Sequence, residues 1–201
     1  MRLFWATSLA VVAGVVGGWM TRGRARPPAP VLRPATDGLL AEGGSDDLMT
    51  RDEGDYLVSA GADTRYVENP PTSGPQYESW AAWGSFTESV PRGVWVHNLA
   101  HGGVAYLYRP DARPGVIAAL RRDLDALAVD GRCGHAWTLM TPDPELDLEW
   151  AVVSWGHVLT ARDVDDDAVI RFTRAHRGER AQKCAPGDWA AAKRSVPVGS
   201  P

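Results

Sequence analysis

Residues 104–127 read VAYLYRPDARPGVIAALRRDLDAL, and this stretch decides the fold. Val104–Tyr108 is a short apolar run rich in aromatic and β-branched residues, which predicts a strand. The pattern then changes, and Asp111–Asp130 predicts a helix with Pro114 near its first turn and Gly131 as its stop. One face of that helix is apolar and consists of Val116, Ile117, Leu120, Leu124 and Leu127.

The same two patterns recur on either side of this stretch. Further strands are predicted at 94–96, at Ala136–Thr141 and at Trp150–Leu159, the last one interrupted by Gly156. A second helix is predicted from Asp165 to His176, with aspartates at its amino end. The order strand, strand, helix, strand, strand, helix predicts an α+β fold: an antiparallel sheet with two main helices packed on one face.

A proline-rich segment, Asn69–Gln76, precedes these elements. Its three prolines remove backbone donors and Gly74 favours a positive φ, so the segment is expected to be an irregular, stiff loop. Two interpretations stay open: Ser73 and Gly74 belong to a functional loop, or the loop only covers a sheet edge. Trp80 and Trp83, which follow, fit either a lid over the core or a platform for a ligand.

The amino terminus carries a membrane signal. The apolar run Leu3–Met20 is 18 residues long, which is enough for a short spanning helix, and no convincing cleavage site follows it. We therefore expect a single transmembrane anchor or signal-anchor at 1–20, a flexible linker rich in Pro, Gly and Arg at 21–50, and a globular domain at 51–201. Arginines at 22, 24 and 26 would, by the charge bias alone, keep the carboxyl-terminal side inside the cell.

Charge and cysteine content limit the function classes. The net charge is −4 and the arginines are scattered, so nucleic-acid binding is not expected. The mature part has two cysteines, Cys133 and Cys184, a count compatible with one disulfide outside the cytosol. Two unrelated buried thiols are the alternative, and a metal-thiolate site is disfavoured because no Cys-x-x-Cys pair is present.

Candidate chemistry concentrates in Trp95–Gly103, which reads WVHNLAHGG. Imidazole suits copper and zinc, so His97 and His101 are candidate ligands for one of these ions. The neighbouring β-type run and the glycines favour a loop or strand end over a helix, and a shared ion then requires the chain to turn between the two rings. Two ligands are too few for zinc, so the additional candidates are His135, His157, Met140, Gln76 and the carboxylates, none of which is fixed by spacing. Purely structural histidines remain the alternative.

Two long motifs carry a family resemblance. Pro70–Gln76 reads PPTSGPQ, and Val96–Gly103 reads VHNLAHGG before an apolar strand. With Ser154-Trp155-Gly156 they make the chain resemble the bacterial family catalogued as domain of unknown function 3105, over roughly 69–176. The resemblance implies a single-pass inner-membrane protein with its domain on the periplasmic, extracytoplasmic side, and this implication outweighs the arginine bias. It implies no reaction.

The chain departs from the family pattern at two positions. Gln76 stands where the family has a histidine, and Ala100 stands where it has a glutamate. Both changes remove candidate ligands, which leaves His97 and His101 and makes a rebuilt site a further interpretation. Glutamine can still orient a ligand through hydrogen bonds, whereas alanine cannot.

Three functional hypotheses follow. The first is an extracytoplasmic domain with a copper or zinc site at His97 and His101. The second is a non-catalytic binding module that uses the proline-rich loop and exposed tryptophans at 80, 83 and 95, with a protein or small-molecule partner left open. An enzyme with a histidine general base comes last, because no partner residue lies at a diagnostic spacing and Ser73 lacks the Gly-x-Ser-x-Gly turn of a nucleophile elbow.

Overall fold

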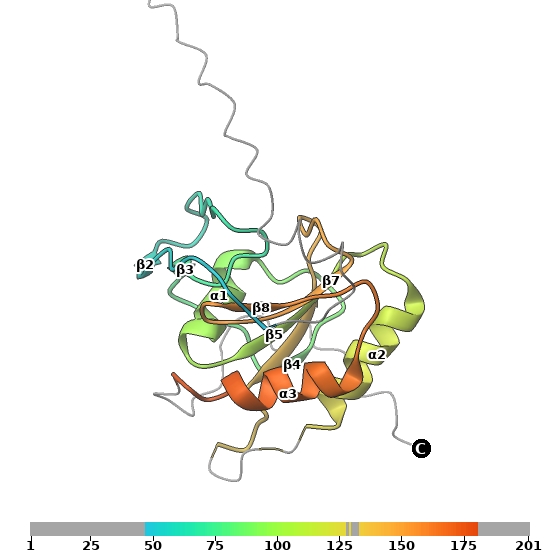
Figure 1. Cartoon of the computed structure of the whole chain (residues 1–201). Helices are drawn as coiled ribbons and strands as arrows, with labels where there is room; N and C mark the ends of the chain where they lie inside the picture. Colours follow the sequence, from blue (N-terminus) through green and yellow to red (C-terminus); the bar gives the residue numbers. More distant parts are fainter. Residues whose placement is uncertain (1–46, 128, 130–132, 181–201) are drawn as a thin grey trace, which may run out of the picture. The chain divides into compact units, whose positions relative to one another are not determined.

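The structure is a computed structural model that describes residues 47–127, 129 and 133–180 (Figure 1). It is an α+β fold, which confirms the predicted class. In chain order the elements are β1 (Leu48–Met49), β2 (Asp55–Val58), β3 (Gly74–Tyr77), β4 (Gly84–Ser85), α1 (Arg92–Ala100), β5 (Val104–Tyr108), α2 (Pro114–Asp125), β6 (Thr138–Pro142), β7 (Trp150–Ser154), β8 (His157–Leu159) and α3 (Asp166–His176).

The main sheet is mixed, so the prediction of an antiparallel sheet is wrong. Its six strands lie in the order β1-β8-β7-β5-β6-β4. Pairing is antiparallel from β1 to β5, whereas β6 lies parallel to β5 and β4 lies parallel to β6. The parallel pair arises because α2 connects β5 to β6 as a crossover helix, a connection that strand-type residue patterns alone do not reveal.

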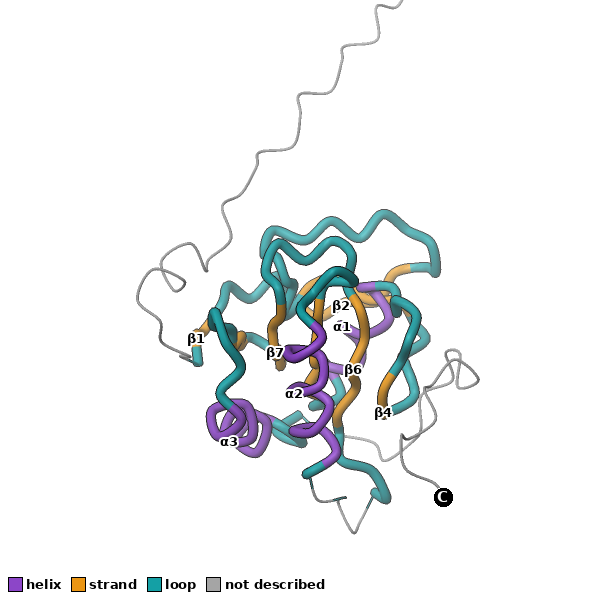
Figure 2. Tube along the Cα trace, turned by 90° about the vertical axis from the view of Figure 1, so that its right-hand side faces the viewer, coloured by secondary structure: helices purple, strands orange, loops and turns teal. Residues whose placement is uncertain are grey.

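Helices cover both faces of this sheet. Helices α2 and α3 pack together over one face, on a core that includes Tyr106, Trp150 and Phe172 (Figure 2). Helix α1 packs over the other face, on a core that includes Phe86, Leu107 and Val153. The two main helices therefore lie on one face as predicted, and a third helix covers the opposite face.

Helix α1 stands where the sequence predicts a strand at 94–96. Every residue from Gly93 to Leu99 is buried in this helix. A helix buried all round has no polar stripe, so its sequence lacks the alternation of apolar and polar faces that identifies an amphipathic helix. The β-branched Val94 and Val96 therefore resemble a strand, and tertiary packing overrides their local preference.

The proline-rich segment is more regular than predicted. Its last part forms β3, which pairs in parallel with β2 and carries Pro75 within the strand. Gly74 adopts the expected positive φ, 113°. Residues 70–76 are all buried, so the segment is part of the interior and does not form an exposed loop.

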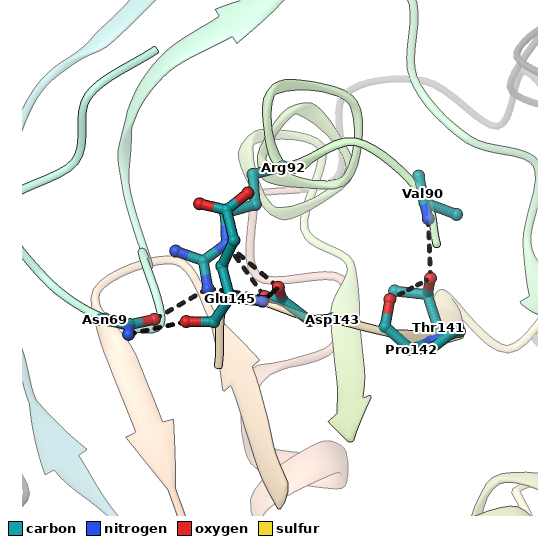
Figure 3. Close-up of polar contacts among 7 residues, drawn as sticks. All are labelled: Asn69, Val90, Arg92, Thr141, Pro142, Asp143 and Glu145. Atoms are coloured by element: carbon teal, nitrogen blue, oxygen red, sulfur yellow. Dashed lines mark hydrogen bonds and ion pairs between the residues drawn. The ribbon is translucent and has the colours of Figure 1, made fainter. Parts of the chain in front are cut away.

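A buried polar network fixes this segment to α1 (Figure 3). The guanidinium of Arg92 forms an ion pair with Asp143 at 2.9 Å, and these side chains are only 12% and 3% exposed. Arg92 also donates to Asn69 Oδ1 at 2.8 Å, and Asn69 Nδ2 donates to the carbonyl oxygen of Glu145 at 2.9 Å. The start of α1, the proline-rich segment and the end of β6 are thereby held together.

The residues for which a membrane anchor is predicted are not among those that the structure describes. The predicted anchor at 1–20 and most of the predicted linker at 21–50 lie outside the described residues, as does Cys184. Among the helices that the structure describes, none combines the length and the apolar character needed to cross a bilayer.

Candidate metal centre

His97 and His101 lie on one face of α1 and at its end, so the prediction that a loop or strand end carries them is wrong. Residues four apart on a helix are neighbours, and the two ring centroids lie 4.7 Å apart with an interplanar angle of 24°. One turn of the helix separates the two residues, and the structure thus brings the two predicted ligands together.

Aromatic and backbone groups contact this pair. His97 Nδ1 donates to the carbonyl oxygen of Tyr77 at 2.6 Å. The ring of Trp80 packs against both imidazoles, at 5.1 Å from His97 and 4.8 Å from His101. A histidine fixed in this way through Nδ1 presents Nε2, which is how many ligating histidines are oriented.

The other predicted candidates do not converge on this pair. Met140 lies in the apolar core under α2 and α3, across the sheet from α1. His135 stacks on Trp83 with ring centroids 5.0 Å apart. Gln76 is buried, and its Nε2 donates to Asp55 Oδ1 at 2.9 Å.

Ser73 and Gly74 fix the position of the chain around them. The Ser73 hydroxyl accepts a hydrogen bond from the Glu53 amide at 2.7 Å, and the Gly74 amide donates to the Gly54 carbonyl at 2.8 Å. Ser73 is 1% exposed, so its role is to hold the proline-rich segment against the chain at Glu53 and Gly54.

The tryptophans do not form the predicted contact surface. Trp95 and Trp83 are buried, at 0% and 8% exposure, and Trp80 is half-buried against the histidines. The prediction of exposed tryptophans is therefore wrong for Trp83 and Trp95, since both rings contribute to the interior.

A second histidine cluster lies on the opposite side of the sheet. Asp47, His157 and His176 are the one group of three or more His, Cys, Asp or Glu side chains, within the described residues, that could hold a metal ion. Asp47 Oδ1 lies 3.0 Å from His157 Nδ1, and Asp47 Oδ2 lies 2.7 Å from His176 Nε2. All the ligand atoms of the group lie within 4.8 Å of one another.

Three elements position this group. His157 begins β8 and pairs in register with Met49 of β1, which places Asp47 just beyond the end of the short strand. The amide of Thr50 donates to the carbonyl of Gly156 at 2.9 Å and holds β1 in place. His176 ends α3, and its ring centroid lies 4.2 Å from that of His157.

The second ring nitrogen of His176 also faces a carboxylate. His176 Nδ1 lies 3.3 Å from Glu179 Oε2. A ligating histidine commonly donates its other ring N–H to such a carboxylate, which fixes the tautomer and raises the basicity of the ligating nitrogen. The cluster therefore contains three candidate ligand side chains and a carboxylate that could support one of them.

Solvent reaches the cluster unevenly. The side chain of His176 is 8% exposed, whereas those of His157 and Asp47 are 24% and 43% exposed. An ion could enter from the side of Asp47 while His176 anchors it from the interior.

One buried carboxyl of α2 has a perturbed pKa. Burial raises the pKa of Asp123 to about 6, and the negative charge of Asp166 adds to the rise. Its Oδ2 is buried and has no hydrogen-bond partner among the described residues. Burial likewise raises the pKa of Tyr106, whose hydroxyl lies 2.7 Å from that of Thr173 on the same side of the sheet.

Sequence reasoning named His157 and missed Asp47 and His176. Asp47 lies within the stretch predicted as linker, and His176 is the last residue of a predicted helix. The signal that the sequence offers is that His176 is one of only five histidines in the chain. Residues 47 and 176 meet only through the pairing of β1 with β8 and the packing of α3.

Comparison with known proteins identifies a family. A family model described as protein of unknown function (DUF3105) matches residues 58–191, more than half of the chain. Neither the curated proteins nor the solved structures that were compared gave a match.

Proposed function

Because the chain belongs to the DUF3105 family, whose description carries no activity, we propose a function from the residues of the chain itself. The proposed function is that of a membrane-tethered, extracytoplasmic domain that binds a divalent transition-metal ion. Asp47, His157 and His176 are the proposed ligands, and zinc or copper is the proposed ion.

The observation that carries this proposal is the placement of one carboxylate between two imidazole nitrogens, at 3.0 and 2.7 Å. Donors around a tetrahedral zinc ion lie about 3.3 Å from one another when each bond is about 2.0–2.1 Å long. The ligand atoms therefore need only a small separation to admit an ion. The bound ion would replace the two hydrogen bonds to Asp47.

Three protein ligands leave one position of a tetrahedral ion open. Structural zinc sites are closed by four protein ligands, whereas sites that act on a bound molecule keep a water or substrate in the fourth position. Among the described residues the group has three ligands, and its Asp47 side is open to solvent. This composition favours an ion that exchanges or binds a further molecule.

His97 and His101 are the second candidate ligands. The observation in their favour is the 4.7 Å separation of their rings and the fixed tautomer of His97. The first cluster is favoured because, among the described residues, it is the group in which three ligand side chains lie within reach of one another.

The tether and the location are part of the same proposal. The apolar run at 1–20 supports an inner-membrane anchor, and the resemblance supports a periplasmic domain. A disulfide between Cys133 and Cys184 would fit that compartment. Alkylation of free thiols before and after reduction of the purified chain tests this pairing, and thiols that are fully accessible before reduction argue against it.

Zinc titration of the full chain by isothermal calorimetry tests the metal site. His176→Ala is expected to weaken zinc binding by about 100-fold or more, because it removes a buried ligand together with its supporting carboxylate contact. Asp47→Ala and His157→Ala are expected to weaken binding as well.

His135→Ala is the matched control, since His135 stacks on Trp83 and lies in neither candidate site. Zinc binding that is absent, or unchanged in all three ligand variants, contradicts the proposal. Binding that is lost only in His97→Ala and His101→Ala assigns the ion to the second candidate pair.

A further inference from the structure

The cavity beside Asp47 has the composition of a ligand site. We propose that it holds a small organic carboxylate that occupies the open position of the ion bound by Asp47, His157 and His176. This inference rests on the proposed function and specifies the class of molecule that the metal centre binds.

The cavity has a volume of about 190 Å³. Because a water molecule takes up about 30 Å³ in the liquid, the space equals roughly six waters, which suits a carboxylate with about three to five carbons. Its walls come from β8, α3 and the residue before β1: Asp47, Leu159, Ala168, Arg171, Phe172 and Ala175.

The cavity adjoins the proposed metal centre. Asp47 belongs to both. The ring of Phe172, a wall residue, has its centroid 4.7 Å from that of His176. Leu159 lies two residues after His157 on the same strand, so both side chains point to the same face of the sheet.

The wall chemistry indicates an anion that has an apolar part. Leu159, Ala168 and Phe172 are buried apolar side chains, which favour a hydrocarbon chain over a fully hydrated ion such as phosphate. Arg171 is the cationic wall residue, and within the described residues it makes no hydrogen bond or ion pair. A carboxylate placed between Arg171 and the ion would meet positive charge on both sides.

Butyrate is the probe for this proposal. The full chain is loaded with zinc, zinc binding is confirmed by calorimetry, and butyrate is then titrated. The comparison ligands are 1-butanol and n-butylamine, which keep the hydrocarbon chain and remove the negative charge. Butyrate is expected to bind, and the two comparison ligands are not.

Two variants test the position of the carboxylate. Arg171→Gln is expected to weaken butyrate binding by about 10-fold, the usual effect of losing one charge-assisted hydrogen bond. Ala175→Leu is expected to abolish binding, because the added atoms fill the cavity from an exposed position on α3 without disturbing the core. Arg174→Gln is the matched control, since Arg174 is exposed on the same helix outside the cavity.

The outcomes separate this inference from the proposed function. A chain that binds no zinc overturns both. A chain that binds zinc normally but binds no butyrate overturns only the inference. Butyrate binding that is equal in Arg171→Gln, Ala175→Leu and Arg174→Gln, or that is unchanged by removal of zinc, also overturns it.

Discussion

The two histidine clusters lie on opposite faces of one sheet and differ in their neighbours. On the α1 face, His97 and His101 contact the ring of Trp80, and His97 donates to a backbone carbonyl. On the α2 and α3 face, His157 and His176 contact the carboxylates of Asp47 and Glu179. Ring separations are similar, 4.7 and 4.2 Å, so the spacing of the imidazoles does not distinguish the clusters.

The difference shows that the role of a histidine pair depends on the donors around it. Aromatic rings stabilise imidazoles by packing and supply no ligand atom, whereas carboxylates supply both a ligand and a hydrogen-bond acceptor. We therefore expect the α1 face to determine stability and the α2 and α3 face to determine binding.

Removal of the buried cation of the α1 face should have the largest effect on stability. Arg92→Leu leaves the Asp143 carboxylate, 3% exposed, without its ion-pair partner, so the free energy of unfolding is expected to fall by about 3 kcal/mol. Urea unfolding followed by tryptophan fluorescence measures this loss. Arg109→Leu is the control, because the Arg109–Asp111 pair is exposed, and an equal loss in both variants would contradict the assignment.

A close contact behind α1 should give the next largest effect. A Cβ atom at Gly103 would lie 2.6 Å from the Trp83 ring and 2.7 Å from the Asn98 carbonyl oxygen. Gly103→Ala is therefore expected to lower the free energy of unfolding by about 2–3 kcal/mol.

Gly115→Ala on α2 is the counterpart on the other face. A Cβ atom there meets nothing within 4 Å, so the better helix propensity of alanine should raise stability by about 0.5 kcal/mol. Thermal unfolding of Gly103→Ala and Gly115→Ala measures both effects. A loss of stability in Gly115→Ala would contradict the expected difference in packing between the two sites.

Variants in the two clusters should differ in how much zinc raises their free energy of unfolding. Without zinc, His97→Ala is expected to cost about 2 kcal/mol, because it removes a buried ring and its hydrogen bond, and His157→Ala should cost less. At zinc concentrations about 100-fold above the dissociation constant, the chain should gain about 2.7 kcal/mol of stability.

His97→Ala should keep that gain and His157→Ala should lose it. Urea unfolding with and without zinc measures the difference. A gain that is lost in His97→Ala and kept in His157→Ala would reverse the roles assigned to the two faces.

The pH-dependent effect concerns a buried carboxyl on the α2 and α3 face. The pKa of Asp123 is raised from 3.8 to about 6, so protonation of this carboxyl stabilises the folded state. This contribution is complete below about pH 4 and is lost as the pH rises through 6. Asp123→Asn should therefore raise the free energy of unfolding by about 1–2 kcal/mol at pH 8 and change it little at pH 4.

Urea unfolding at pH 4, 6 and 8 measures the effect of Asp123→Asn. Asp125→Asn, an exposed change on the same helix, is the control. Parallel pH profiles for the parent chain and Asp123→Asn would contradict the assignment.

Much of the fold could be predicted from local patterns. The predicted strand Val104–Tyr108 is β5, and the predicted helix at Asp165–His176 is α3 within one residue, because an apolar stripe beside polar residues identifies a half-buried helix. Helix α1 could not be predicted in this way, because it is buried on every side.

The candidate sites follow the same division. His97 and His101 are neighbours in sequence and could be paired from spacing alone. Asp47 and His176 are 129 positions apart, and only the pairing of β1 with β8 and the packing of α3 bring them together. A local motif carries no information about such convergence.

The amide of Gly178, two residues after α3, donates to the carbonyl oxygen of Gly102, the residue that follows His101, at 2.7 Å. This hydrogen bond connects the segment that follows α3 to the segment that follows α1. If the end of α3 moves when an ion binds, this hydrogen bond would transmit the movement to the backbone at Gly102, next to His101. The amide chemical shifts of Gly102 and Gly178, measured by nuclear magnetic resonance, would therefore respond to binding of an ion by Asp47, His157 and His176.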